Sequence, residues 1–176
     1  MDVVFDVDGT LMNIEHRVKY AKRNLPKLDA LDYPIPNPDY DYGKFESEIV
    51  NDTPNHEVFA IAIALHLEEH RIIIASGRKR KQMNKTLEML LAYGKEHMLS
   101  EGGKFWSDDS KLCLRERVYF RADGDNRRDD VVKEEMYEQM LKDGYDPKLV
   151  FDDRQQVVDM WRSKGIRVCQ VAVGDF

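Results

Sequence analysis

The chain has 176 residues, 34% of them charged, and a formal net charge of −6 at pH 7. This length predicts one domain with an independent core, and the negative charge argues against a broad basic surface for nonspecific duplex binding while leaving room for a small basic groove. The longest apolar run, Val58–Leu65, is far shorter than the roughly 20 residues of a membrane span.

Two cysteines, Cys113 and Cys169, stand in different segments without a paired spacing. This favours buried, reduced thiols over a disulfide or a zinc site. Asp2 and Asp6 interrupt any secretory signal at the start of the sequence. We therefore expect a cytoplasmic protein without membrane partners, or one in the cytoplasm of the host cell if the source is a virus.

The first predicted element is a short buried strand over residues 3–7, and two carboxylates, Asp6 and Asp8, stand where it ends. Successive strand side chains alternate between faces, so these carboxylates are expected to point the same way. The carboxyl end of a strand is where open α/β sheets bind their ligands. A solvated turn is one explanation of such a motif, and a site for one metal ion or one phosphate is the other.

Residues 12–51 form the least regular part of the sequence and hold four of its six prolines. The same segment carries Tyr33, Tyr40 and Tyr42, which are available to stack on a base. Because the segment follows the first strand, we expect it to lie across the ligand edge. A long connection of this kind is usually functional or disordered. It is interpreted as a lid or a substrate-recognition insert, with a peripheral flap as the alternative.

After this insert, strand-like and helical patterns alternate, as in parallel α/β sheets. Strands are predicted over residues 71–75, 117–120, 148–151 and 166–172. One helix is predicted to open at Thr53-Pro54 and to run to about residue 69. Three more are predicted over about 79–93, 129–143 and 154–164, each closed by the glycine that follows, Gly94, Gly144 and Gly165. The predicted fold class is α/β, a Rossmann-like parallel sheet with helices on both faces and a small cap-like insert.

Three further groups follow the Asp-x-Asp start in order: Ser76-Gly77-Arg78 after the second strand, Lys133 within a helical pattern, and Asp152-Asp153-Arg154 after the fourth strand. A small hydroxyl residue, a lysine and an acidic pair in this order resemble the haloacid dehalogenase-type phosphatases. The resemblance implies one haloacid dehalogenase-like phosphatase domain over residues 1–176, with its insert at about 12–51.

The chemistry expected of this set is Mg²⁺-dependent hydrolysis of a phosphate monoester through an aspartyl-phosphate. Asp6 is the candidate nucleophile and Asp8 the general acid and base. Hard oxygen atoms suit Mg²⁺, so the carboxylates of Asp6 and Asp153 and the backbone carbonyl of Asp8 are expected to hold the metal, with Asp152 orienting the site. Ser76, Gly77 and Lys133 are expected to contact the phosphoryl group. Without the other motifs, Lys133 would be interpreted as an ordinary surface lysine of a helix, paired with Asp129.

Within that superfamily, residues 128–135, 152–161, 170–172 and 174–176 closely resemble the 3′-phosphatase domain of the bacteriophage polynucleotide kinases. By this resemblance Arg17, Arg78, Arg121 and Asp129 are functional residues. Arg78 and Arg121 would contact phosphate or the adjoining nucleotide, and Asp129 would brace the arginines. The sequence contains no P-loop motif, so no kinase activity is expected from it.

The leading functional hypothesis is removal of a 3′-phosphate from nucleic-acid ends, with a separate kinase or ligase as a possible partner. Hydrolysis of free deoxynucleoside monophosphates is the alternative. A module that only binds phosphorylated ends is disfavoured, because carboxylates repel phosphate unless a metal is present. The basic residues Arg78, Lys79, Arg80, Lys81 and Lys85 form either a strand contact or a solvated helix face. The sequence leaves the oligomeric state open.

Overall fold

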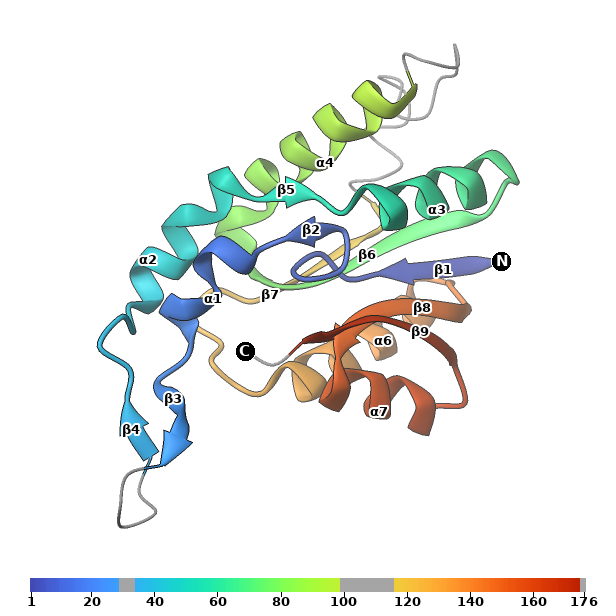
Figure 1. Ribbon diagram of the computed structural model, residues 1–176. Helices are drawn as coiled ribbons and strands as arrows, with labels where there is room; N and C mark the ends of the chain where they lie inside the picture. The colour runs from blue at the N-terminus through green and yellow to red at the C-terminus, as the bar shows by residue number, and fades with distance from the viewer. Residues whose placement is uncertain (29–33, 99–115, 175–176) are drawn as a thin grey trace.

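A computed structural model describes residues 1–28, 34–98 and 116–174. Its centre is a five-stranded sheet of order β7-β6-β1-β8-β9 (Figure 1). The strands are β1 (Asp2–Phe5), β6 (Arg71–Lys79), β7 (Val118–Arg121), β8 (Pro147–Arg154) and β9 (Arg167–Gly174). All neighbouring strands in this sheet are parallel, which confirms the predicted fold class.

Helices cover both faces of the sheet (Figure 1). α3 (His56–Leu67) and α4 (Met83–Met98) pack on one face, and α6 (Asp129–Lys142) and α7 (Gln155–Ser163) pack on the other. Because strand side chains alternate, Val3 and Phe5 enter the first core and Val4 enters the second. The central strand β1 is thus held from both sides, and this fixes the position of the residues that follow it.

The predicted insert consists of small elements at the carboxyl ends of β1 and β6 (Figure 1). They are β2 (Met12–Asn13), α1 (Glu15–Ala21), β3 (Asn24–Leu28), β4 (Pro34–Pro36), α2 (Tyr42–Ser47) and the 3₁₀ turn η1 (Glu48–Asn51). β3 and β4 pair antiparallel, and α1 contacts α2. β2 pairs with β5 (Thr53–Pro54), which ties the start of the insert to the residues that close it.

This pairing makes the predicted start of α3 wrong. Thr53 and Pro54 form an antiparallel pair with β2 and do not cap a helix. The helix begins at His56 after Asn55, whose N–H donates to the Leu11 carbonyl at 2.9 Å. The backbone hydrogen bonds of residues 53–55 close the insert, so this pairing and not helix propensity decides where α3 begins.

The predicted end of α4 is also wrong. The helix passes through Gly94 to Met98, and Gly94 is not among the glycines with positive φ. One glycine inside a helix costs only about 1 kcal/mol relative to alanine, so neighbouring residues with high helix propensity can offset this cost and the helix continues past Gly94. Gly144 and Gly165 do end their helices, with φ of 85° and 77°, as predicted.

The strand β6 is longer than predicted and includes Ser76, Gly77 and Arg78. These residues were expected where a strand passes into a helix, but α4 begins only after the 3₁₀ turn η2 (Arg80–Gln82). The pairing with β7 continues past Ser76, with a register shift before Lys79. The shift turns the strand at Gly77 and Arg78, beside the end of β1.

Cys169 is an exposed free thiol on β9, so the expectation that it is buried is wrong. β9 is an edge strand of the sheet, where alternate side chains face solvent. Cys113 and Tyr33 lie outside the described residues. Among the helices of the described residues, none is both long and apolar enough to cross a membrane.

Candidate active site

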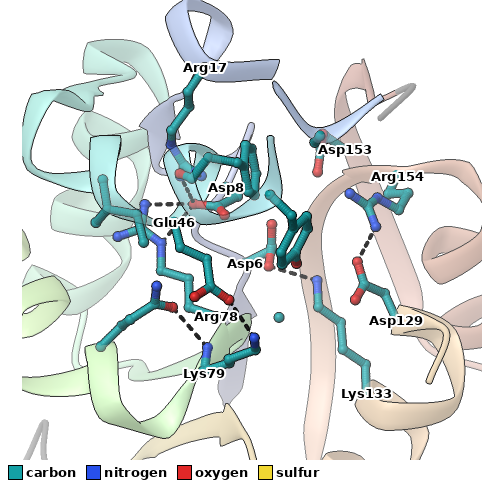
Figure 2. Close-up of a pocket in the computed structure, with 16 residues that line it drawn as sticks. Asp6, Asp8, Arg17, Glu46, Arg78, Lys79, Asp129, Lys133, Asp153 and Arg154 are labelled. Atoms are coloured by element: carbon teal, nitrogen blue, oxygen red, sulfur yellow. Dashed lines mark hydrogen bonds and ion pairs between the residues drawn. The ribbon is translucent and has the colours of Figure 1, made fainter. Parts of the chain in front are cut away.

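The end of β1 places Asp6 next to a buried lysine (Figure 2). The Asp6 N–H donates to the Phe151 carbonyl of β8 at 3.0 Å. Lys133, one turn into α6, donates from Nζ to Asp6 at 2.7 Å and to Asp152 at 2.8 Å. Burial opposes the charge of Lys133, but the two carboxylates raise its pKa above the usual value. One ammonium group therefore joins β1, α6 and β8.

Asp153, the last of this acidic group, lies against two glycines. A Cβ atom at Gly9 or at Gly174 would overlap its carboxylate, so the Asp153 side chain would have to move if either glycine were replaced. Gly9 also has a φ of 80°, which side chains rarely adopt. The close approach and the positive φ explain why glycine follows the Asp-x-Asp start, and the absence of a side chain there leaves room for the Asp153 carboxylate beside Asp6.

Oxygens of Asp6, Asp152 and Asp153 lie within 4.8 Å of one another. Burial, with help from Asp152, raises the pKa of Asp153 to about 6. Burial also raises the pKa of Asp6, although Lys133 opposes this. Three buried carboxylates with one ammonium group are short of positive charge. Their hard oxygen atoms fit Mg²⁺, which uses one or two carboxylates with water and phosphate oxygens.

Asp8 occupies a different environment, between two arginines (Figure 2). Its Oδ1 accepts from Arg17 at 2.8 Å and from Arg78 at 2.7 Å. Burial would raise the pKa of Asp8, but Arg78 and Arg17 together lower it. The side chain of Asp8 is therefore held away from the group of Asp6, Asp152 and Asp153, although Asp6 and Asp8 line one pocket.

Asp52 completes this arginine network, and it was not among the residues predicted from the sequence. Its carboxylate accepts from Arg17 at 2.7 Å and 2.9 Å and also from Arg78. Arg78 additionally donates to the Thr86 hydroxyl at 3.0 Å. Asp52 is fully buried and directly follows the predicted insert. The only sequence signal is its place between η1 and β5, which is not informative by itself.

Asp129, at the first position of α6, accepts from Arg121 and from Arg154. Arg121 also donates to the Gly77 carbonyl at 2.9 Å and to the Arg127 carbonyl at 2.7 Å. Asp129 thus braces Arg121, whereas Asp8 and Asp52 hold Arg78. The role of Arg154 was not predicted, although it follows the acidic pair in the same motif.

A pocket of about 150 Å³ connects these groups. Most residues that the sequence assigned line it: Asp6, Asp8, Arg17, Gly77, Arg78, Asp129, Lys133 and Asp153. Ser76, Arg121 and Asp152 are buried outside its lining. The Ser76 hydroxyl accepts the Arg78 N–H at 3.2 Å.

Side chains of the insert close one side of the pocket, notably Tyr42, Phe45 and Glu46 of α2. Of the tyrosines assigned to base stacking, only Tyr42 lines it within the described residues. Tyr40 instead packs under Arg23, whose guanidinium is 5.6 Å from the ring centroid.

Residues 38–176 match the family described as the polynucleotide kinase PNKP phosphatase domain. The chain belongs to this family. It is a phosphomonoester hydrolase domain of the haloacid dehalogenase type, as the motif order implied. The match begins after Asp6, Asp8 and Arg17, so the placement of those residues in the site rests on the geometry above.

Solved structures agree with this membership. A chain in a structure of the Pnkp1/Rnl/Hen1 RNA repair complex superposes with a TM-score of 0.64 at 25% identity, over 99% of this chain and 43% of that one. A chain of a second Pnkp1/Rnl/Hen1 complex has a TM-score of 0.64 at 23% identity, over 99% of this chain and 47% of that one. This chain spans less than half the length of both.

Proposed function

We propose that this protein removes 3′-phosphates from nucleic-acid ends in a Mg²⁺-dependent reaction through an aspartyl-phosphate at Asp6. The observation that carries the proposal is the position of Asp6. Its carboxylate lines the pocket, is held by Lys133 at 2.7 Å, and lies beside Asp152 and Asp153. A nucleophile needs a fixed carboxylate next to positive charge that the phosphate can share.

In the first step an oxygen of Asp6 bonds to phosphorus, and the bond from phosphorus to the 3′-oxygen breaks. The leaving oxygen takes a proton from Asp8. In the second step Asp8 takes a proton from water, the water oxygen bonds to phosphorus, and Asp6 is released with inorganic phosphate. The arginines lower the pKa of Asp8, which keeps its carboxylate ionised, the form that the second step needs. A bound phosphate dianion raises the pKa of a neighbouring carboxylate, which helps to protonate Asp8 for the first step.

Asp6 and Asp153, with the backbone carbonyl of Asp8, would hold the Mg²⁺. A Mg²⁺ ion held by these groups would neutralise charge on the transferring oxygens. Asp152 orients Lys133, which lies 2.8 Å from it. Lys133 itself places positive charge against both Asp6 and the phosphoryl group, as the sequence motif implied.

The remaining assigned residues bind the substrate in this proposal. Ser76 and the amide of Gly77 meet the phosphate at the turn of β6. Arg17 and Arg78 hold Asp8. Arg78 follows Gly77 in the chain, and Arg121 donates to the Gly77 carbonyl at 2.9 Å from outside the pocket lining, so in this proposal both would contact the phosphate or the adjoining nucleotide. Asp129 keeps Arg121 in place. The insert acts as the lid over this site.

Family membership and the RNA repair complex among the structural relatives support a nucleic-acid end as the substrate. A separate kinase or ligase would then act on the same end. Free deoxynucleoside monophosphates are the second candidate, because the pocket of about 150 Å³ is small and the net charge is −6.

Phosphate release separates these candidates. The substrates are a 3′-phosphorylated oligonucleotide, the 5′-phosphorylated isomer, and free 3′- and 5′-mononucleotides, each with Mg²⁺ and with a chelator. We expect the highest kcat/KM with the 3′-phosphorylated oligonucleotide and loss of turnover on chelation. Preference for a mononucleotide would instead support the second candidate, and turnover without a divalent metal would overturn the metal assignment.

A further inference from the structure

Glu46 of α2 joins the insert to the two lysines that follow β6. Its Oε1 lies 2.5 Å from Lys79 Nζ, and its Oε2 lies 3.2 Å from Lys81 Nζ. Figure 2 shows Glu46 reaching across the pocket to Lys79, on the side opposite Lys133. The side chains of Glu46 and Lys79 are each 18% exposed, and that of Lys81 is 57% exposed. The ion pair therefore lies at the pocket entrance, in contact with solvent.

Both sides of this contact are fixed by hydrogen bonds of the backbone. The Lys79 N–H donates to the Gln82 side chain at 3.0 Å, and the Lys81 N–H donates to Asp123 at 3.0 Å. On the other side, Asp41 caps α2 by accepting the Lys44 N–H at 2.9 Å. The backbone of both lysines is therefore held in place independently of Glu46.

The charge at this entrance is partly cancelled. Burial would raise the pKa of Glu46, but its hydrogen bonds with Lys79 and Lys81 lower it below the usual value. Glu46 is thus an anion at neutral pH, and it neutralises one of the two positive charges. The basic run of the sequence is consequently a weaker anion site than its composition suggests.

We propose that Glu46 occupies, in the free enzyme, the place where the next backbone phosphate of a bound strand meets Lys79 and Lys81. This inference rests on the proposed function, because it requires a strand in the site. Gly77, Arg78 and Lys79 are consecutive and line one pocket with Asp6. In this proposal a terminal phosphate at Gly77 lies two residues from Lys79 on the same strand, and the adjoining nucleotide extends past Lys79 and Lys81.

Strand binding then exchanges one anion for another at the lysines. A phosphodiester displaces the Glu46 carboxylate, and the displaced carboxylate stays nearby and repels the strand. A mononucleotide has no second phosphate and gains nothing from the exchange. Glu46 is therefore a specificity residue that weakens strand binding relative to mononucleotide binding.

The test is Glu46→Gln, assayed on a single-stranded 3′-phosphorylated oligonucleotide and on the matching 3′-mononucleotide. The ratio of the two kcat/KM values should rise about fivefold, the upper range for a partly exposed ion pair. The salt dependence should also change. The slope of log kcat/KM against log salt for the oligonucleotide should steepen by up to about 0.7, the value for one phosphate of a single strand, because the lysines no longer share their charge with a nearby carboxylate.

Two controls accompany this variant. Glu138→Gln makes the same change in net charge at an exposed position of α6 outside the pocket, and it should leave the substrate ratio unchanged. Lys79→Gln combined with Lys81→Gln should lower the ratio. Adding Glu46→Gln to that double variant should not raise the ratio, because the two lysines for which Glu46 and the phosphate compete are then absent.

Four outcomes decide the inference. A higher ratio with the steeper slope supports it, and equal losses on both substrates overturn it, because Glu46 would then only hold the insert closed. A ratio that matches the Glu138→Gln control overturns it as well. If neither the unmodified protein nor Glu46→Gln turns over the oligonucleotide while both hydrolyse the mononucleotide, the proposed function fails and the inference that rests on it is overturned as well; an unchanged ratio with oligonucleotide turnover present overturns the inference alone.

Discussion

The two carboxylates of the Asp-x-Asp start end in opposite electrostatic environments. Asp6 belongs to a group with Asp152, Asp153 and Lys133, which we call the lysine half of the site: three carboxylates and one ammonium group. Asp8 belongs to the arginine half, where Asp8 and Asp52 face Arg17 and Arg78, two carboxylates against two guanidinium groups.

The comparison separates two tasks. The lysine half is short of positive charge, so it can accept a divalent cation without becoming overcharged. The arginine half is neutral by itself and densely hydrogen-bonded, so it can hold one side chain in place. We infer that the first half performs the transfer of phosphate and the second half positions the proton donor and acceptor.

The most severe test of the lysine half is Asp6→Asn. An amide cannot become an aspartyl-phosphate, so kcat should fall by about 10⁴-fold or more. The protein should remain folded with Mg²⁺ present, which a thermal melt checks. A variant that kept more than about 1% of the original rate would rule out covalent catalysis at Asp6 and make the division between the halves meaningless.

Asp8→Asn tests the arginine half through its proposed proton transfer. The nucleophile remains, but the leaving oxygen and the attacking water lose their acid and base, so turnover should fall about 10² to 10⁴-fold. An aryl phosphate has a leaving group that needs no proton. Its first step should therefore be less affected, and phosphoenzyme should accumulate. Equal losses in the first step with aryl and nucleotide substrates would contradict the acid role.

The sequence predicted the lysine half well, because its residues stand at the ends of predicted strands or in one ordered motif. Asp6 follows an apolar run, and Asp152 and Asp153 follow another. Parallel strands bring such ends to one edge. The position of Lys133 came from the family resemblance, since a lysine in a helix carries no signal of its own.

The arginine half was predicted only in part. Arg17 and Arg78 were assigned by resemblance as functional residues, but their shared partner Asp52 was missed. Asp52 lies after an irregular segment, where no periodicity indicates which side chains turn inward. The register shift of β6 between Ser76 and Lys79, which aims Arg78 at Asp8, is likewise a tertiary effect without a local sequence pattern.

Asp52→Asn distinguishes positioning from chemistry. Both arginines lose a charged acceptor while Asp8 keeps its own contacts, so kcat should fall about 10 to 100-fold, as for other residues that orient a reacting group. Thermal stability should fall too, because two buried guanidinium groups lose a partner. The control is Asp146→Asn, which removes an exposed ion pair with Lys148; its melting temperature and kcat should not change.

The pH profile of Asp52→Asn separates a positioning role of Asp52 from a purely structural one. If Asp52 positions the arginines, its loss changes their contacts with Asp8, and the pH dependence of kcat shifts. A uniform loss across pH with the same profile would mean that Asp52 only stabilises the fold.

The smallest effect is expected at the pocket entrance, with Tyr42→Ala. The Tyr42 ring lies 5.5 Å from that of Phe45 and 5.5 Å from Lys79 Nζ, and it lines the pocket. Stacking on one base contributes about 1–3 kcal/mol, and a half-exposed ring gives the lower end, so KM for the nucleotide substrate should rise about fivefold.

Tyr40→Ala is the matched control, because Tyr40 packs with Arg23 outside the pocket. An aryl phosphate should show little change with either variant. If Tyr42→Ala lowers kcat on the aryl phosphate as much as on the nucleotide, the insert does not recognise a base, and its contribution is closure of both halves of the site.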